Sequence, residues 1–187
     1  MVLLVNACAR SESRTKRLAD ALMKKWDGPV REVRLLDTEM PRVDEAFLGR
    51  RDALLGKGEY DSPLFALARE FAAAGTIVIA APFWDLSFPA ILKQYFELIN
   101  VPGITFVYTS DGTPRGLCKA KALYYVTTAG GTASPLDYGF GYVKALAENF
   151  YGIPEARLIK AEGLDIDGAD VSRIMREAIA SIRAMDT

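Results

Sequence analysis

Hydroxyl and basic side chains gather at residues 6–17, between an apolar strand and a helix. One of the three hydroxyl groups within residues 11–15 is expected to cap the helix. Arg14, Lys16 and Arg17 stand in or near the first helical turn, where the helix dipole disfavours cations unless an anion binds there. Hydroxyls, backbone N–H groups and a guanidinium together bind phosphate well, so this loop predicts a phosphate site. Simple capping without a ligand is the alternative.

Two adjacent aromatic residues follow another apolar strand. The strand is expected over Thr76–Ala80, and the chain breaks at Pro82 into Phe83 and Trp84 before a helix that begins after Pro89. Two neighbouring rings cannot easily both pack inward from one turn, so at least one is expected on the surface or against a ligand. The carboxyl ends of parallel strands are where open α/β sheets bind flat ligands. A loop packed on its own protein is the alternative.

A pair of glycines follows a third apolar strand, within residues 127–132. Glycine permits positive φ and close approach of the backbone, so Gly130 and Gly131 predict a loop whose N–H groups can face a ring. Alone, the pair is also typical of a plain turn. The three loops all follow strands of one predicted parallel sheet and emerge at the same edge, so we expect them to form one site.

The composition excludes several classes of function. The chain of 187 residues contains no histidine, which excludes histidine-based nucleophilic catalysis and histidine-ligated metals. In an enzyme of this kind, a bound cofactor would carry the difficult chemistry. With 23 basic and 24 acidic residues, the chain has no excess of positive charge for binding nucleic acid. Cys8 and Cys118 fit no metal or redox spacing, and a buried apolar role is expected for each.

The sequence shows neither a membrane-spanning segment nor a signal peptide. No stretch approaches the ~20 apolar residues that a membrane span needs. Residues 1–5 are too short and too uncharged to resemble a signal peptide. We therefore expect a cytoplasmic protein without a membrane partner.

Strands and helices alternate along the chain. Strands are expected at Val2–Val5, Val30–Leu36, Thr76–Ala80, Lys121–Thr127 and Ala156–Ala161, with an excursion strand or ribbon at Ile104–Tyr108. Helices are expected at Thr15–Trp26, Asp44–Leu55, Leu64–Ala74, Ala90–Asn100, Leu136–Tyr151 and Asp170–Met185. The longest irregular stretch, residues 37–61, is where a lid or dimer contact is expected.

This alternation predicts an α/β fold of the flavodoxin-like type. Five strands separated by helices favour a parallel sheet covered on both faces, in the order 2-1-3-4-5. The fold would be a three-layer sandwich in which residues 1–187 form a single domain. The first loop lacks the spacing of a P-loop or of a Rossmann fingerprint, so nucleoside triphosphates and Rossmann-bound NAD are disfavoured.

The chain resembles the FMN-dependent NAD(P)H azoreductases and quinone reductases, a branch of the flavodoxin-like superfamily. The matching runs are residues 81–84, 92–96, 103–109, 116–117, 119–121, 128–131 and 161–163, in one collinear order over nearly the whole chain. A phosphate in the first loop, a ring against the second and backbone donors in the third also describe flavin mononucleotide (FMN).

The resemblance implies specific contacts. Residues 13–15 match the phosphate segment, residues 82–85 line the isoalloxazine ring with the backbone near Asp85 facing N5, and residues 128–131 contact the pyrimidine edge. Phe106 and Tyr108 match aromatic positions on the substrate side. The residues expected to bind FMN are Arg10, Ser13, Arg14, Thr15, Pro82, Phe83, Trp84, Asp85, Thr128, Ala129, Gly130 and Gly131.

The family differs from this chain at a few of these positions. It often has Asn where Asp85 stands, Arg where Ala129 stands and Ser where Ala7 stands, and its first loop is about one residue longer. These departures bear on the affinity for FMN and on substrate range more than on the fold.

The activity that the resemblance implies is a two-electron, ping-pong reduction of quinones or azo compounds, with NADH or NADPH as the donor. Hydride would pass to N5 of FMN and then to the second substrate. The family is typically homodimeric, and each active site is completed by the partner subunit. Two alternatives remain at this point: a flavodoxin-like electron carrier and a flavin-free regulatory or scaffold protein.

Overall fold

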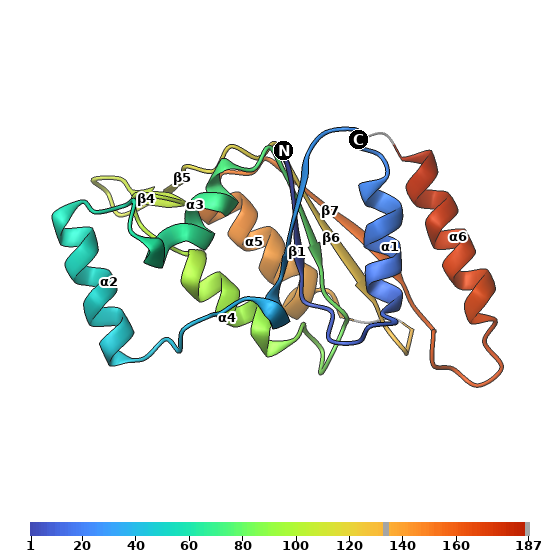
Figure 1. The fold of residues 1–187 in the computed structure, drawn as a ribbon. Helices are drawn as coiled ribbons and strands as arrows, with labels where there is room; N and C mark the ends of the chain where they lie inside the picture. Colours follow the sequence, from blue (N-terminus) through green and yellow to red (C-terminus); the bar gives the residue numbers. More distant parts are fainter. Residues whose placement is uncertain (133–134, 186–187) are drawn as a thin grey trace.

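One five-stranded parallel sheet organises the structure (Figure 1). The computed structural model describes residues 1–132 and 135–185. The strands are β1 (Val2–Asn6), β2 (Val30–Arg34), β3 (Thr76–Ala80), β6 (Ala122–Thr128) and β7 (Glu155–Ala161), in the order β2-β1-β3-β6-β7. Numbered among themselves, these five strands have the order 2-1-3-4-5, which confirms the predicted flavodoxin-like topology.

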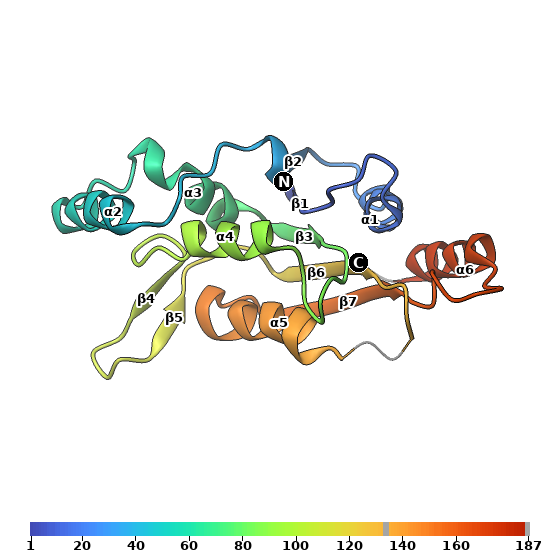
Figure 2. The same ribbon diagram turned by 90° about the horizontal axis from the view of Figure 1, so that it is seen from below.

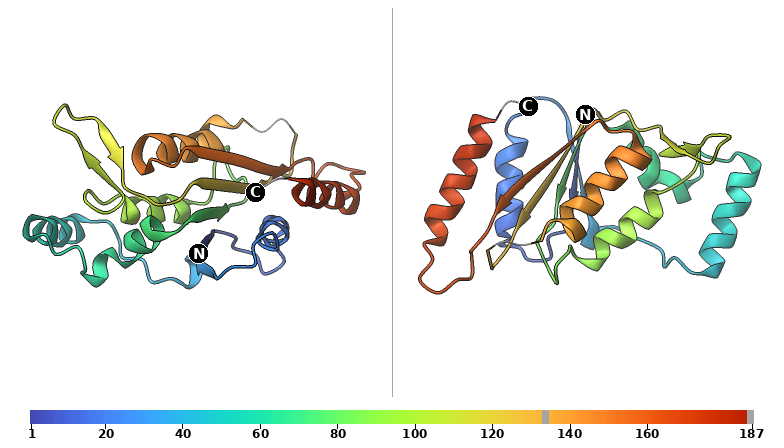
Figure 3. Two further views of the ribbon diagram at one scale, coloured as in Figure 1. Left: turned by 90° about the horizontal axis from the view of Figure 1, so that it is seen from above. Right: turned by 180° about the vertical axis from the view of Figure 1, so that it is seen from behind.

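Helices connect the strands and cover both faces of the sheet. The α-helices are α1 (Arg14–Met23), α2 (Glu45–Lys57), α3 (Ala66–Ala73), α4 (Ala90–Ile99), α5 (Tyr142–Leu146) and α6 (Val171–Ala184). Short 3-10 turns lie at Leu35–Asp37 and Pro63–Phe65, and π-helical turns flank α5 at Asp137–Gly141 and Ala147–Tyr151. Helices α1 and α6 cover one face, and α3, α4 and α5 cover the other (Figure 3).

The sequence of β1 explains its central place. Successive side chains of a strand point to opposite faces, so Leu3 and Val5 enter the core under α3 to α5 while Val2 and Leu4 enter the core under α1 and α6. All four side chains are buried. A strand with four consecutive apolar residues is stable only where both faces are covered, as predicted from its continuous apolar run.

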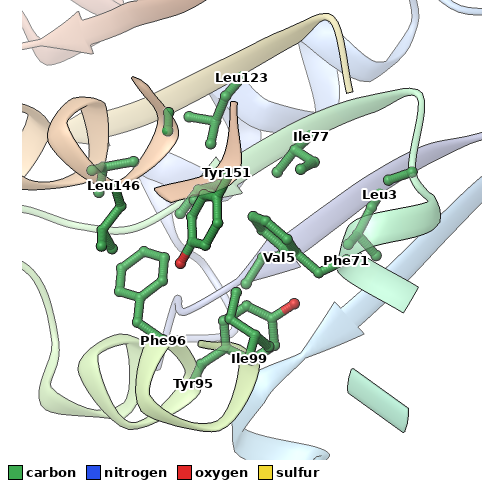
Figure 4. Packing of buried hydrophobic residues seen from close by; sticks show 14 of the residues in the cluster. Leu3, Val5, Phe71, Ile77, Tyr95, Phe96, Ile99, Leu123, Leu146 and Tyr151 are labelled. Carbon is green, nitrogen blue, oxygen red and sulfur yellow. The ribbon is translucent and has the colours of Figure 1, made fainter. Parts of the chain in front are cut away.

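The larger of the two cores is rich in aromatic rings (Figure 4). Phe71 of α3 packs edge-on against Tyr151, with 4.8 Å between ring centroids, and against Tyr95 of α4. The hydroxyl of Tyr151 donates to Oδ1 of Asn100 at 2.8 Å, so this buried phenol keeps a hydrogen bond. Burying each such ring contributes about 2 kcal/mol. The packing fixes α3, α4 and α5 against the sheet, and with them the starts and ends of the loops.

The predicted excursion at Ile104–Tyr108 is confirmed as part of a hairpin. Strands β4 (Phe106–Tyr108) and β5 (Pro114–Gly116) pair antiparallel and lie apart from the main sheet (Figure 2). The hairpin connects the end of α4 to the start of β6. In a parallel sheet flanked by helices, such a connection lies at the amino ends of the strands.

Some predicted boundaries differ from the structure. The strand expected over Val30–Leu36 ends at Arg34, because Leu35 turns into a 3-10 helix and the Thr38 hydroxyl donates to the carbonyl of Arg34 at 2.8 Å. The helix expected over Leu136–Tyr151 is present, with π-helical hydrogen bonding at both ends. Among the described residues, no helix is both long and apolar enough to cross a membrane.

Candidate functional site

A pocket lies where the loops after β1, β3 and β6 meet at the carboxyl edge of the sheet. Its lining is Ala9, Arg10, Glu12, Ser13, Arg14, Thr15, Pro82, Phe83, Trp84, Thr128, Gly130 and Asp165. Most of the residues that the sequence predicted to bind a cofactor are therefore brought together. Asp85, Ala129 and Gly131 are predicted residues outside this lining, and Ala9, Glu12 and Asp165 are lining residues that the sequence reasoning missed.

The first loop presents the amino end of α1 to the pocket. Ser13 is the N-cap, and its hydroxyl accepts a hydrogen bond from the backbone N–H of Lys16 at 3.2 Å, which confirms the predicted cap. The first N–H groups of a helix have no intrahelical acceptor. Within the described part of the chain, the N–H groups of Arg14 and Thr15 have no acceptor, so they are available to an anion.

A buried pair of hydroxyls joins the first loop to the third. Oγ1 of Thr15 and Oγ1 of Thr128 lie 2.6 Å apart, and both side chains are buried. The bond holds the start of α1 against the end of β6. It therefore fixes the distance between the predicted phosphate segment and the predicted pyrimidine segment.

The second loop contains a tight turn in an unusual backbone conformation. Trp84 and Ser87 exchange two backbone hydrogen bonds, at 3.1 and 2.8 Å, around Asp85 and Leu86. These two residues have φ of 50° and 68°, the left-handed region that costs side-chain-bearing residues about 1 kcal/mol or more each. Trp84 is 41% exposed, which confirms that one residue of the aromatic pair reaches the surface.

The strained turn makes a testable prediction. Replacing Leu86 by glycine is expected to raise the free energy of unfolding by about 1 kcal/mol, because glycine has no strain at this φ and Leu86 buries little surface. Leu36→Gly is the matched control, at a similarly exposed leucine with ordinary backbone, and should lower it by about 1 kcal/mol. Urea unfolding of the flavin-free protein measures both. Equal losses in the two variants would contradict the assignment of strain to Leu86.

The third loop differs in part from the prediction. Neither Gly130 nor Gly131 uses the positive φ that glycine permits. At Gly130 the close neighbour is a side chain of the same protein, since a Cβ would lie 2.4 Å from Oδ2 of Asp165. Glycine at 130 is therefore needed for space rather than for its backbone conformation.

A second, smaller cavity adjoins the pocket behind Phe83. Phe83 and Ala129 line it together with Tyr125 and Thr127 of β6. The hydroxyls of Tyr125 and Thr127 are buried, and neither makes a well-formed hydrogen bond with a described residue. Such hydroxyls ordinarily bond to an ordered water or a ligand.

Phe106 and Tyr108 do not join the pocket of their own chain. They lie in the β4–β5 hairpin, at the opposite edge of the sheet from the three loops (Figures 1 and 3). Phe106 is buried against Phe150, whose ring centroid is 4.7 Å away, and Tyr108 is 58% exposed. Within one chain, the predicted substrate-side aromatics are thus separated from the predicted flavin contacts.

Cys8 is buried as predicted, whereas Cys118 is only half-buried, so the prediction of full burial is wrong for Cys118. Cys8 is buried, and its Sγ lies 3.6 Å from the carbonyl oxygen of Ala80. Burial raises the pKa of the Cys8 thiol and raises that of Cys118 to about 12, so neither is a thiolate at neutral pH. The described residues contain no cluster of histidine, cysteine and acidic side chains suited to a metal.

The loop after β7 is the part of the site that sequence reasoning overlooked. Arg14 donates to the carbonyl of Leu164 at 2.9 Å and forms an ion pair with Asp165 at 2.8 Å. The loop after β7 emerges at the same edge of the sheet as the other three, because β7 is parallel to β6. That signal was present in the sequence and would have indicated residues 162–165.

A doubly wound sheet in this order, with its pocket at the carboxyl edge, defines the flavodoxin-like class of protein. A family model described as "Flavodoxin-like fold" matches residues 1–185. An FMN-dependent NADH:quinone oxidoreductase of Clostridium beijerinckii is 35% identical, over 95% of this chain and 93% of its own length. The corresponding protein of Lachnoclostridium phytofermentans is also 35% identical, over 94% and 92%. The chain belongs to the flavodoxin-like fold family, in the branch that contains the FMN-dependent NADH:quinone oxidoreductases.

Solved structures agree with this fold. An azoreductase from Bacillus anthracis superposes with a TM-score of 0.83, at 23% identity over 97% of this chain and 95% of that one. An FMN-dependent NADH-azoreductase from the same organism, solved in complex with FMN, superposes with a TM-score of 0.79, at 21% identity over 97% and 94%. At these identities the superpositions show a shared fold.

Proposed function

We propose that this chain is an FMN-dependent oxidoreductase that uses NADH to reduce quinones or azo compounds by two electrons. The observation that carries the proposal is the pocket itself. Residues from four loops far apart in the sequence line it, and most of them are residues expected to bind FMN. The names of relatives at 35% identity over nearly the full chain support the same activity.

The amino end of α1 has the donors that a flavin phosphate requires. The Ser13 hydroxyl, the Arg14 guanidinium and the free N–H groups of Arg14 and Thr15 lie together at the positive end of the helix dipole. No acidic residue stands in the first turn of α1. The donor set fits a phosphate, and Arg10 adds a further positive charge to the rim.

The second loop has the apolar surface and the free backbone donors expected where a flat ring binds. Pro82, Phe83 and Trp84 provide apolar surface, as flat cofactors require. The N–H groups of Asp85 and Leu86 take no part in the Trp84–Ser87 turn, and no described residue accepts from them. These N–H groups can therefore donate to polar atoms on the edge of a ring. The strained backbone of the turn holds them in that orientation.

The absence of histidine agrees with this assignment of roles. When bound, FMN supplies the two-electron chemistry, so the chain needs no general base of its own. Its residues bind the cofactor and orient it. The apolar surface around Phe83 and Trp84 also excludes water from the reacting face.

We also propose that the active form is a homodimer. Phe106 and Tyr108, expected on the substrate side, lie at the far edge of their own chain and can reach a flavin only from a second copy. The exposed Tyr108 ring on a projecting hairpin supports this arrangement. Sedimentation analysis should give twice the monomer mass, and a concentration-independent monomer would contradict the dimer. Cytoplasmic location stays a prediction.

The decisive test is reduction of the flavin by NADH. Apo-protein loaded with FMN should lose its visible flavin absorbance when NADH is added without oxygen, and a quinone added afterwards should restore it. Free FMN at the same concentration is the control, because uncatalysed reduction is slow. A flavin that binds but is not bleached would favour the electron carrier, and failure to bind FMN would favour the flavin-free scaffold. Neither alternative is favoured by the named relatives.

A further inference from the structure

We propose that Asp165 is a positioning residue: it holds the guanidinium of Arg14 at the phosphate end of the pocket. The inference rests on the proposed FMN site and extends it to a loop that none of the predicted contacts includes. The ion pair between Arg14 and Asp165 joins residues 151 positions apart in the sequence.

The backbone that carries Asp165 is fixed to the third loop. The N–H groups of Gly163, Leu164 and Asp165 donate to the carbonyls of Gly131, Ala129 and Gly130, at 2.8, 3.2 and 3.0 Å. This pairing continues the hydrogen bonding between β7 and β6 beyond the strand ends. Asp165 is therefore presented by a rigid edge of the sheet, as a positioning residue requires.

Arg14 is held by two different acceptors on that edge. One terminal nitrogen donates to the carbonyl of Leu164 at 2.9 Å, and the other donates to Oδ1 of Asp165 at 2.8 Å. The side chain of Arg14 is 29% exposed, whereas that of Asp165 is 66% exposed. A guanidinium has five N–H donors in a planar fork. Two are used here, so three remain for a phosphate.

Without this restraint, Arg14 would be poorly placed. It is the first residue of α1, where the helix dipole repels a cation, and the first turn contains no acidic residue to compensate. A long side chain under that repulsion turns toward solvent. The carboxylate of Asp165 counteracts the repulsion and keeps the guanidinium at the pocket until a phosphate binds.

The glycine at position 130 makes room for the carboxylate. A Cβ there would lie 2.4 Å from Oδ2 of Asp165 and 3.0 Å from its Cγ. A side chain at position 130 would displace Asp165 from Arg14 while leaving both charges in the chain. Gly130→Ala is therefore a second way to break the contact, independent of removing the charge.

A competing role for Asp165 has the opposite sign. As an anion in the lining, its carboxylate could instead compete with the phosphate for Arg14. The neutral Leu164 carbonyl favours positioning, because it holds the guanidinium in place whether or not a phosphate is present. The two roles are separated by the direction in which FMN affinity changes.

The experiment compares FMN with riboflavin, which lacks the phosphate. Apo-protein is titrated with each, by quenching of flavin fluorescence, for the unaltered chain, Asp165→Ala, Asp165→Asn and Gly130→Ala. Asp165→Ala should raise the Kd for FMN roughly three- to tenfold, because a charge-assisted hydrogen bond to a partly exposed arginine is lost. Asp165→Asn should lose less, since its amide oxygen still accepts from Arg14. Gly130→Ala should raise the Kd for FMN by a larger factor than the Kd for riboflavin, because Gly130 itself lines the pocket and its added methyl also displaces Asp165. Riboflavin affinity should stay unchanged in Asp165→Ala and Asp165→Asn.

Arg14→Ala provides the second arm. It should weaken FMN binding by more than Asp165→Ala, and adding Asp165→Ala to it should change nothing further, because Asp165 acts through Arg14. Tighter FMN binding in Asp165→Ala would overturn the proposal in favour of competition. Equal losses for FMN and riboflavin would overturn it in favour of a general structural role. If the unaltered chain does not prefer FMN to riboflavin, the proposed phosphate site itself is wrong.

Discussion

Gly116→Ala is expected to lower the free energy of unfolding by about 3 kcal/mol, because a well-packed site has no room for the added methyl. A Cβ at Gly116 would lie 2.1 Å from the backbone N of Gly152 and from the carbonyl carbon of Tyr151. These are backbone atoms, so no side-chain rotation can relieve the contact. Gly116 ends β5 and packs against the π-helical turn at Ala147–Tyr151. Urea unfolding of the flavin-free protein measures the loss.

The matched control for Gly116 is Gly49, in the interior of α2. A Cβ at Gly49 meets no atom within 4 Å, so Gly49→Ala should raise the free energy of unfolding by about 0.5–1 kcal/mol through helix propensity. If both variants changed stability by the same amount, the close packing of the hairpin against Tyr151 and Gly152 would be wrong. Dimerisation should also weaken in Gly116→Ala, because the displaced hairpin carries Phe106 and Tyr108.

Raising the pH above 9 is expected to destabilise the fold steeply. Burial raises the pKa of the Cys118 thiol from 9.0 to about 12. Burial also raises the pKa values of Tyr95, Tyr125 and Tyr151 above their ordinary 10.0. The unfolded chain therefore releases these protons at lower pH than the folded chain does. The stability that the protonated groups provide is complete below pH 9 and is lost as the pH rises toward 12.

The size of the alkaline effect is about 1 kcal/mol per pH unit for each group that titrates only in the unfolded chain. Between pH 9 and 10 the thiols dominate, because tyrosine ionises later even when unfolded. Cys118→Ala should therefore flatten the slope of unfolding free energy between pH 9 and 10 and leave the tyrosine-driven loss above pH 10. Urea unfolding midpoints of both proteins at pH 8, 9, 10 and 11 would measure this dependence of stability on pH. Stability that is constant from pH 8 to 10 would contradict the partial burial of the Cys118 thiol.

The pattern of the chain was sufficient to predict the fold. The continuous apolar run of β1 requires a strand covered on both faces, and alternation of strands with helices leaves few topologies. The aromatic pair Phe83-Trp84 and the hydroxyl-rich loop before α1 were found for the same reason, since each is an unusual use of residue types near a strand end. These features can be recognised from residues adjacent in the sequence, without knowing which residues they contact in the folded chain.

Other features could not be read from the chain. Two residues without glycine's freedom, Asp85 and Leu86, adopt positive φ, while Gly130 and Gly131 do not. Nothing in the residue types predicts this exchange. The positive φ at Asp85 and Leu86 is held by the two backbone hydrogen bonds between Trp84 and Ser87, and the Asp165 carboxylate lies close to Gly130.

The amino-acid sequence alone therefore predicted the strand order, the edge of the sheet where the site lies and three of the loops that form the site. The folded chain alone revealed the Arg14–Asp165 ion pair and the separation of Phe106 and Tyr108 from their own pocket. The physical reason is the range of the interactions. Hydrophobic periodicity and turn chemistry act between near neighbours along the chain. An ion pair across 151 positions, or a carboxylate that requires a glycine, depends on side chains that only the packed sheet brings together.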